Sequence, residues 1–278
     1  MDLLSCIVCD LWIRFFGVAW VDGPLADSDD ALVQAVADAI ADSRIGVDIQ
    51  GIHTVHHPSA VLYGECLARL VDPQGRRHEA SEFIPALERR GATPMLDGCM
   101  IRLVLNQLEA DPLAVLGCNL SADTLVGQKA WLSVIEQVGA RAHLARRLVL
   151  EITETRPLGE IGCLSRRLDQ ARRLGCRIAI DDFGTGHLTP LQLYQLSTDI
   201  VKLDAGFIWE IRGLDEKVSS LRHLVDFAKS FVPVVVIEGV ESAADFRNAR
   251  AAGASHVQGW YLSRPTPAGL GKKKPAGT

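Results

Sequence analysis

The sequence predicts an α/β protein, a modified (β/α)8 TIM-type barrel with an antiparallel first strand and a short N-terminal appendage. From about residue 47 onward, short runs rich in Val, Ile and Leu alternate with longer amphipathic stretches, the pattern of β/α units around a parallel sheet. The apolar runs number eight, which is the strand count of such a barrel. Polar residues gather at the ends of these runs, where barrel proteins of this class carry their chemistry.

The eight predicted strands are short and apolar: 47–53, 61–71, 114–120, 148–153, 177–182, 199–203, 233–238 and 256–259. Only "TVHHPSA" lies between the first two strands, which is too short for a crossover helix, so we expect an antiparallel hairpin there. Helical patterns occur between the later strands, at 81–90, 96–109, 128–140, 159–174, 189–196, 217–230 and 242–252.

The same pattern divides the chain into three parts. Residues 1–45 hold an apolar run and a helix-like stretch, "DSDDALVQAVADAIADSR", and we expect an appendage or the remnant of a preceding domain. Residues 46–268 form the predicted barrel domain. Residues 269–278 include "GKKKPAGT", for which we expect a flexible basic tail.

Composition places the chain among globular proteins. Of its 278 residues, 48% are hydrophobic and 23% are charged, which allows a sizeable core and excludes the disordered class. The formal net charge of −5 gives no general attraction for polyanions, so duplex nucleic acid is not expected as a partner. The hydrophobic N-terminal segment carries Asp2, Asp10 and Arg14 and lacks a basic start, so neither a signal peptide nor a membrane span is expected.

The seven cysteines have no repeating spacing, and most lie inside apolar runs. We expect them to be reduced core residues, which favours a cytoplasmic location. Cys6 and Cys9 form a C-x-x-C pair, but no second pair or nearby histidine accompanies them. Packing of small apolar side chains is therefore preferred to a zinc or redox role.

Polar side chains stand at or near the end of almost every predicted strand. They are Glu65, Arg69, Asn119, Glu151, Glu154, Asp181, Asp182, Lys202, Asp204, Glu238 and Gln258. An unpaired buried carboxylate costs several kcal/mol, so a positive group must balance these acids. Oxygen ligands without histidine or thiolate suit Mg²⁺ or Mn²⁺, and five or more carboxylates are enough for two ions. The adjacent aspartates in "IAIDDFGTG" would then serve two metals, one of them as a bridge.

Each of these residues also has an ordinary structural interpretation. Asn119 and Ser121 could cap the next helix, Lys202 could pair with a single acid, and Gly184 and Gly186 could serve a turn. Taken jointly, these interpretations are less convincing, because they require about seven independent coincidences at about seven strand ends. The composite site is therefore favoured.

Eight motifs, in order along the chain, resemble those of the EAL-domain cyclic di-GMP phosphodiesterases. They are "GECLAR" (64–69), "EFIPALE" (82–88), "NLSA" (119–122), "EITET" (151–155), "DDFGTG" (181–186), "VKLD" (201–204), "EGVES" (238–242) and "QGWYLSRP" (258–265). The resemblance covers nearly all of residues 47–267. The family fold is a modified (β/α)8 barrel with an antiparallel first strand, in agreement with the hairpin inferred above.

The resemblance implies the following ligand and catalytic roles. One Mg²⁺ or Mn²⁺ ion would be held by Glu65, Asn119, Glu151 and Asp181, and a second by Asp181, Asp182 and Glu238. Lys202 would lie beside the attacking water and would act in catalysis together with Glu65, Asp182 and Glu238.

The resemblance also implies roles around this centre. Arg69 would contact the phosphate of the substrate, Gln258 would position water or phosphate, and Gln50 and Leu67 would belong to the substrate site. Of the remaining residues with an implied role, Glu154 would hold the loop after the fifth strand, and Asp204 and Glu241 would support the site from outside.

Some positions depart from the family pattern. The signature has cysteine where the family has alanine, a change at a non-liganding position that should leave metal binding intact. "HLTPL" (187–191) follows "DDFGTG" where the family usually has an aromatic residue and serines, in a loop that couples the site to the dimer interface. The first strand keeps Gln50 but lacks the proline after it, and Leu70 replaces a common tryptophan, so substrate affinity is expected to differ.

The resemblance implies hydrolysis of cyclic di-GMP to linear pGpG by a water that two metal ions activate, which lowers the level of a bacterial second messenger. It also implies a homodimer, and a sensory or cyclase-like domain outside this chain is a further expected partner.

The alternative is a catalytically weak or silent EAL module that acts as a cyclic di-GMP receptor, which the changed loop at 187–191 favours. An unrelated metal-dependent barrel enzyme, such as a lyase or aldolase, would explain the acidic strand ends but not the eight motifs. His53, His56 and His57 are expected in a solvated turn.

Overall fold

Eight strands close into a barrel in the computed structural model, which describes residues 28–153, 161–185, 188–212 and 218–268. Around the barrel the strands follow the order β1-β9-β8-β7-β6-β5-β4-β2, and β2 pairs back with β1. β1 runs antiparallel to both of its barrel neighbours, whereas the other neighbouring strands are parallel. The predicted modified barrel with an antiparallel first strand is confirmed.

The barrel strands agree closely with the predicted runs: β1 (Ile45–Thr54), β2 (Val61–Val71), β4 (Leu116–Leu120), β5 (Leu148–Thr153), β6 (Arg177–Phe183), β7 (Ile200–Leu203), β8 (Val234–Ile237) and β9 (His256–Val257). Two short strands were not predicted. β3 (Arg77–Glu79) extends the sheet beside β2, and β10 (Thr266–Pro267) pairs with β1. Strands of two or three residues are too short to show an alternating pattern in a sequence.

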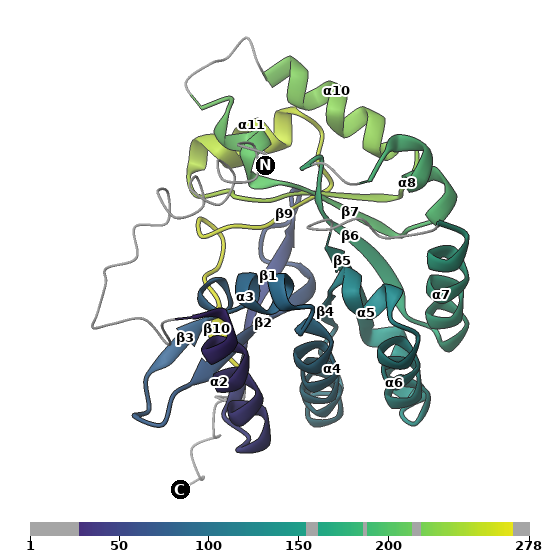
Figure 1. Cartoon of the computed structure of the whole chain (residues 1–278). Helices are drawn as coiled ribbons and strands as arrows, with labels where there is room; N and C mark the ends of the chain where they lie inside the picture. The colour runs from purple at the N-terminus through teal and green to yellow at the C-terminus, as the bar shows by residue number, and fades with distance from the viewer. Residues whose placement is uncertain (1–27, 154–160, 186–187, 213–217, 269–278) are drawn as a thin grey trace, which may run out of the picture.

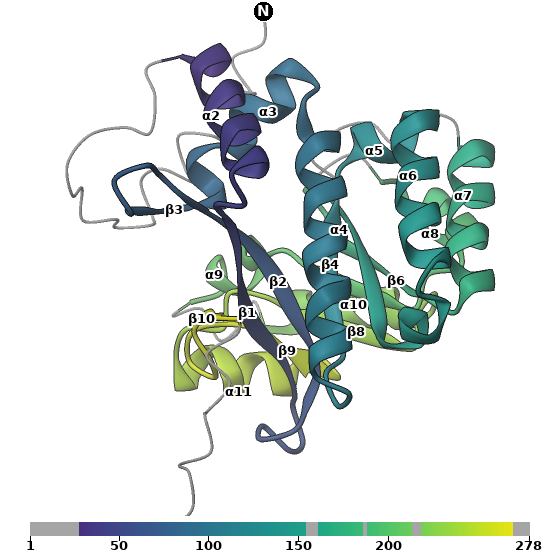
Figure 2. The same ribbon diagram turned by 90° about the horizontal axis from the view of Figure 1, so that it is seen from below.

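The helices cover the outside of the barrel, and α4, α6 and α7 lie side by side along it in both ribbon views (Figure 1, Figure 2). The helices are α2 (Asp29–Ala41), α3 (Ile84–Arg90), α4 (Thr93–Ala110), α5 (Ala122–Val126), α6 (Gln128–Gly139), α7 (Ile161–Leu174), α8 (Pro190–Leu196), α9 (Ala205–Trp209), α10 (Val218–Lys229) and α11 (Ala243–Ala251). The five-residue helices α5 and α9 were not predicted, because they are shorter than two helical turns. The predicted start of α7 at residue 159 lies outside the described residues.

Helix α2 begins as the sequence indicates. The Ser28 side chain accepts a hydrogen bond from the Ala31 amide at 3.3 Å, which caps the helix. Val36 on its inner face is fully buried, so the helix packs against the rest of the protein. Ion pairs from Arg89 and Arg90 to the aspartates of its first turn join α2 to α3. Residues 1–27 lie outside the described part of the chain.

The apolar core has two layers. The larger layer fills the space between the strands and the helices. A smaller cluster lies inside the barrel, where one side chain from each of six strands meets the others. Its buried members are Ile52, Tyr63, Val149, Ala179, Ile200 and Val236. We call this inner cluster the barrel floor. It excludes water from the underside of the layer of side chains that lies above it.

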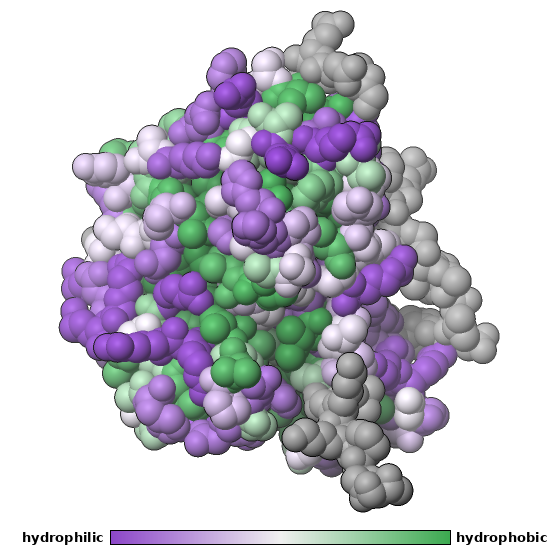
Figure 3. Space-filling model, turned by 180° about the vertical axis from the view of Figure 1, so that it is seen from behind, coloured by the Kyte–Doolittle hydropathy of each residue, from purple (hydrophilic) through white to green (hydrophobic). Residues whose placement is uncertain are grey.

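The surface is mixed in character. On the face shown in Figure 3, hydrophobic residues gather in the centre and hydrophilic residues surround them.

Of the cysteines that the structure describes, Cys66, Cys99, Cys118 and Cys176 are buried and all are free thiols, as expected for core residues. Within the described residues, the structure contains no helix with the length and apolar character that crossing a bilayer requires.

Asp97 on α4 fixes the loop that follows β4. Its Oδ2 atom accepts hydrogen bonds from the Ser121 amide at 2.9 Å and from the hydroxyls of Ser121 and Thr124 at 2.6 Å each. Asp97→Ala should lower the free energy of unfolding by about 2–4 kcal/mol, because three hydrogen bonds are lost and buried donors are left unpaired. Urea unfolding followed by circular dichroism measures this change.

The matched control is Asp226→Ala, which removes an exposed aspartate on α10. This control should change the free energy of unfolding by less than about 0.5 kcal/mol. Equal unfolding midpoints for the two variants would show that the Asp97 hydrogen bonds do not hold the loop.

Candidate functional site

The polar residues of the candidate site form a layer directly above the barrel floor. Side chains two positions apart on a strand point to the same face. Glu65 therefore follows Tyr63 into the barrel, and in the same way Glu151 follows Val149. The pattern repeats as Ala179 with Asp181, Ile200 with Lys202 and Val236 with Glu238. Because β1 runs in the opposite direction, its polar residue Gln50 precedes its floor residue Ile52.

Lys202 lies at the centre of this layer and is fully buried. Its Nζ atom is within 3.2 Å of carboxylate oxygens from three strands and from the residue directly after β8. The distances are 2.8 Å to Asp181, 2.9 Å to Glu238, 3.0 Å to Glu151 and 3.2 Å to Glu65. The structure thus brings together five of the residues predicted from the sequence, and one ammonium group faces four carboxylates.

Neutral donors complete the surroundings of two of these acids. Glu65 accepts hydrogen bonds from the Asn119 side chain at 2.8 Å and from the Gln258 side chain at 2.7 Å. The Tyr63 hydroxyl donates to Glu151 Oε2 at 3.0 Å. Tyr63 was not among the predicted site residues, although its position two residues before Glu65 places it on the inner face of β2.

Burial and charge act in opposite directions on these groups. Burial lowers the pKa of Lys202, but the four carboxylates, with Asp181 first, outweigh it and hold that pKa well above its ordinary value. Burial raises the pKa of Glu151 to about 8 although Lys202 opposes the shift. Burial also raises the pKa of Glu238 well above its ordinary value. At Glu65 the effect of burial is outweighed by Lys202, Gln258 and Asn119, so its pKa is lowered. Added positive charge at this centre would therefore be stabilising.

The turn after β6 places two aspartates at the site. Asp182 has a φ of 52°, a left-handed conformation that is rare for a residue with a side chain. Gly184 follows with a φ of 103°, and a Cβ atom there would lie 2.5 Å from the Phe207 ring. Burial, followed by the charge of Asp181, raises the pKa of Asp182 well above its ordinary value. The strained turn keeps both carboxylates close to one another at the same strand end.

The donor set suits hard divalent cations. Glu65, Glu151 and Asp181 each offer an oxygen within 4.8 Å of the others, and so do Asp181, Asp182 and Glu238. Asp181 belongs to both groups. Further oxygens are buried and have no hydrogen-bond partner among the residues that the structure describes, namely Asn119 Oδ1, Glu151 Oε1 and Gln258 Oε1. Carboxylate and amide oxygens of this kind are ligands that Mg²⁺ and Mn²⁺ accept, so these residues are suited to bind either ion.

Arg69 lies farther along β2, and the structure pairs it with Asp48 of β1. Its Nε atom is 2.9 Å from Asp48 Oδ2, and both side chains are about nine-tenths buried. Arg77 of β3 contacts the other oxygen of Asp48. Asp48 was not predicted as a site residue, although it stands two residues before Gln50 on the same strand face. The Arg69 side chain is thus fixed on one side by an acid.

The remaining predicted residues lie around the centre. Gln50 donates to the Ser263 carbonyl at 3.0 Å, and its Oε1 atom is 3.4 Å from Gln258 Nε2. Leu67 is partly buried on β2, opposite Asp48. Asp204 caps α9 by accepting from the Gly206 amide at 2.9 Å.

Glu241 does not reach the acidic cluster directly. It forms an ion pair with Arg212 at 2.9 Å, and Arg212 also contacts the Gly239 carbonyl beside Glu238. Glu154, like His187 in the changed loop, lies outside the described residues. Leu188 of that loop is buried.

The expectation of a solvated turn is wrong for His53. This residue lies in β1 and is buried, with Nδ1 2.7 Å from the Pro58 carbonyl and Nε2 2.9 Å from the Ser263 hydroxyl. A shift in the pairing with β2 after Ile52 accompanies this position. His56 and His57 are exposed, as expected.

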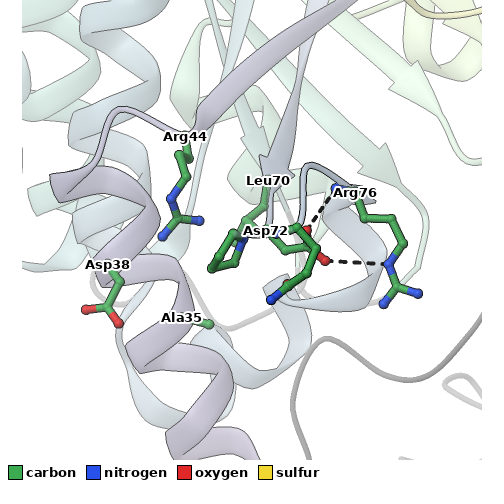
Figure 4. Close-up of a pocket in the computed structure, with 8 residues that line it drawn as sticks. Ala35, Asp38, Arg44, Leu70, Asp72 and Arg76 are labelled. Carbon is green, nitrogen blue, oxygen red and sulfur yellow. Dashed lines mark hydrogen bonds and ion pairs between the residues drawn. The ribbon is translucent and has the colours of Figure 1, made fainter.

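A separate hollow of about 230 Å³ lies between α2 and the turn that joins β2 to β3 (Figure 4). Its lining includes Ala35, Asp38, Arg44, Leu70, Asp72 and Arg76. Leu70 points to this side of β2, whereas its neighbour Arg69 points to the inner face. The departure from the family pattern at Leu70 therefore lies outside the barrel.

The fold and the site together define a barrel protein with a buried acidic cluster, which could hold cations, at the carboxyl ends of its strands. The EAL domain family model matches residues 33–265, so the chain belongs to the EAL domain family. A relative from Escherichia coli (strain K12), "Probable cyclic di-GMP phosphodiesterase PdeG", is 30% identical over 209 residues, which are 72% of this chain and 41% of the relative. "Cyclic di-GMP phosphodiesterase PdeF" of the same strain is 29% identical and is aligned over 74% of this chain and 28% of its own length. The chain thus spans less than half the length of these relatives.

Solved structures share the fold. "PaMucR Phosphodiesterase, c-di-GMP complex" has a TM-score of 0.73 and 26% identity, over 85% of this chain and 98% of that chain. The FimX EAL domain from Pseudomonas aeruginosa, bound to c-di-GMP, has a TM-score of 0.75 and 22% identity, over 84% of this chain and 96% of that chain. These similarities support the barrel assignment.

Lys202→Met tests the balance of charge at the centre. Without the ammonium group, four carboxylates lie together with no cation, so the free energy of unfolding in the presence of a chelator should fall by about 3–5 kcal/mol. Added Mg²⁺ should restore part of this loss. Urea unfolding with EDTA and with Mg²⁺ measures both effects.

Lys229→Met is the matched control, because Lys229 is on the outer helix α10 and contacts a backbone carbonyl. It should unfold near the native midpoint under both conditions. If the two lysine variants lose the same stability, Lys202 does not neutralise the cluster.

Proposed function

We propose that this protein is a cyclic di-GMP phosphodiesterase that hydrolyses cyclic di-GMP to linear pGpG. The observation that carries the proposal is the pair of three-carboxylate groups that share Asp181, with the buried Lys202 at their centre. Membership of the EAL domain family and the names of the relatives supply the substrate. Every ligand position of the family motif is filled in this chain.

The residues can be assigned to steps of a phosphodiester hydrolysis. Glu65, Asn119, Glu151 and Asp181 would hold one Mg²⁺ or Mn²⁺ ion, and Asp181, Asp182 and Glu238 a second. Two such ions, when bound, lower the pKa of water and neutralise charge on the phosphoryl and leaving oxygens.

The chain's own residues would then act on the phosphoryl group. Lys202 adds positive charge beside the reacting phosphorus, where negative charge grows during the displacement. Gln258 holds Glu65 in place, and its Oε1 atom, which lacks a partner within the described part of the chain, would accept a hydrogen bond from water. Arg69, oriented by Asp48, would donate to a phosphate oxygen of the substrate.

Several further proposals rest on the same family membership. The protein would act in the bacterial cytoplasm and form a homodimer, and a sensory or cyclase-like domain outside this chain would control it. A receptor that binds cyclic di-GMP without hydrolysing it is the competing function. Incubation of the purified chain with cyclic di-GMP and Mn²⁺, followed by chromatography for pGpG, separates the two. Product supports the enzyme, and binding without product supports the receptor.

Glu65→Gln and Asp181→Asn should each abolish hydrolysis, because each removes a charged ligand while it keeps the size of the side chain. Formation of pGpG in the presence of Mn²⁺ measures the effect. Asp226→Asn, a change of the same kind on the exposed side of α10, should keep the native rate. Native turnover in either site variant would refute the two-metal assignment.

Arg69→Gln should raise KM for cyclic di-GMP about 10-fold with a smaller change in kcat, because a charged hydrogen-bond donor to the phosphate is lost. Steady-state kinetics measure both constants. Arg173→Gln removes an exposed arginine at the end of α7 and serves as the control. An unchanged KM in Arg69→Gln would mean that Arg69 acts only through its structural partners, the carboxylates of Asp48 and Glu79.

A further inference from the structure

Tyr63 differs from the other members of the barrel floor because it carries a polar atom into the layer above. The side chain is 1% exposed, and its ring packs with the floor residues. Its hydroxyl donates to Glu151 Oε2 at 3.0 Å. A phenol fixed by its ring is a rigid donor, because only two side-chain torsions have to be restrained.

The contact crosses a strand. Tyr63 is on β2 and Glu151 is on β5, and β4 lies between them in the sheet. The residue of β4 that lies below this contact is Gly117, which pairs with Glu65 on one side and with Val149 on the other. The glycine lets the tyrosine ring reach over the middle strand.

Gly117 has no room for a side chain. A Cβ atom there would overlap Glu151 Oε1 and would lie 2.6 Å from Cε2 of Tyr63. The three residues therefore fit as one unit, in which the glycine leaves the space, the tyrosine fills it, and the carboxylate lies against both.

Glu151 needs this support more than its neighbours do. Its carboxylate is fully buried, so the protein itself must supply its hydrogen-bond donors. Lys202 also contacts Oε2, but that ammonium group is shared with Glu65, Asp181 and Glu238. Tyr63 is the donor dedicated to Glu151.

We propose that Tyr63 is a positioning residue of the metal site, whose hydroxyl fixes the Glu151 carboxylate for the cation that Glu65, Glu151 and Asp181 share. The inference rests on the cation binding in the proposed function and on no property of the substrate. Outer partners that orient metal ligands typically change metal affinity by about 10–100-fold when they are removed. Tyr63 fits this role because it holds a ligand without being one.

Tyr63→Phe removes only the hydroxyl and keeps the ring in the floor. Calorimetric titration of the full chain with Mn²⁺, without substrate, should show a Kd raised about 10-fold or more. Tyr194→Phe is the matched control, since Tyr194 is 70% exposed on α8 and should keep the native Kd. A native Mn²⁺ affinity in a folded Tyr63→Phe variant would overturn the proposal.

A second measurement does not depend on a variant at position 63. The chain has three tyrosines, so the double variant Tyr194→Phe/Tyr261→Phe leaves Tyr63 as the only one. Titration with Mg²⁺, which does not absorb, should give an ultraviolet difference spectrum of the tyrosine type, because the cation polarises the carboxylate to which the phenol donates. Absence of a tyrosine signal while Mg²⁺ binds would also overturn the proposal.

The two possible failures can be told apart. If the native chain binds neither Mn²⁺ nor Mg²⁺, the metal-dependent function is wrong, and the role of Tyr63 is wrong with it. If the native chain binds Mn²⁺ and Tyr63→Phe binds it equally well, only the role of Tyr63 is wrong. Gly117→Ala, which places a methyl group against Glu151 and Tyr63, should raise the Kd for Mn²⁺, as Tyr63→Phe does.

Discussion

The contact of one buried ammonium group with four buried carboxylates organises this protein. Lys202, Glu65, Glu151 and Asp181 come from four different strands and Glu238 directly follows a fifth, β8, so the cluster exists only when the barrel is closed. Charges of one sign would repel in such a small volume, and burial makes that repulsion stronger. The barrel can hold these acids together only because a cation of its own lies among them. The atoms that are proposed to bind small cations are therefore the same atoms on which the stability of the barrel depends.

The layering of the barrel interior explains why this cluster is so well shielded. The floor residues close the space below the acids, and the six strands that form the floor also supply the polar layer through the two-residue repeat. A shift of a single strand by one residue would exchange an apolar side chain for a polar one in both layers. Register is thus fixed by the chemistry of the site as well as by the helices outside.

Much of this arrangement can be predicted from the sequence. Val149 to Glu151 and Ala179 to Asp181 show the apolar-then-polar spacing within single strands, so the strand ends could be recognised and assigned to one rim. The ion pair of Asp48 with Arg69 could not be predicted, because it depends on the register of an antiparallel hairpin. The Tyr63 contact was missed for a related reason: it crosses β4, and only the structure shows that Gly117 leaves the space. Strands β3 and β10 are too short to leave a periodic pattern.

The reversed direction of β1 has a mechanical consequence. Because β1 runs against its neighbours, its first residues lie at the rim that carries the acids, and Asp48 near its start holds Arg69. Helix α2 ends at Ala41, only a short segment before this rim. A displacement of α2 would reach Asp48, and through it Arg69, by way of the short turn at 42–43 and the first residues of β1, without crossing the barrel. Helix α2 is therefore placed so that a small movement of it can be transmitted to Arg69 at the edge of the site.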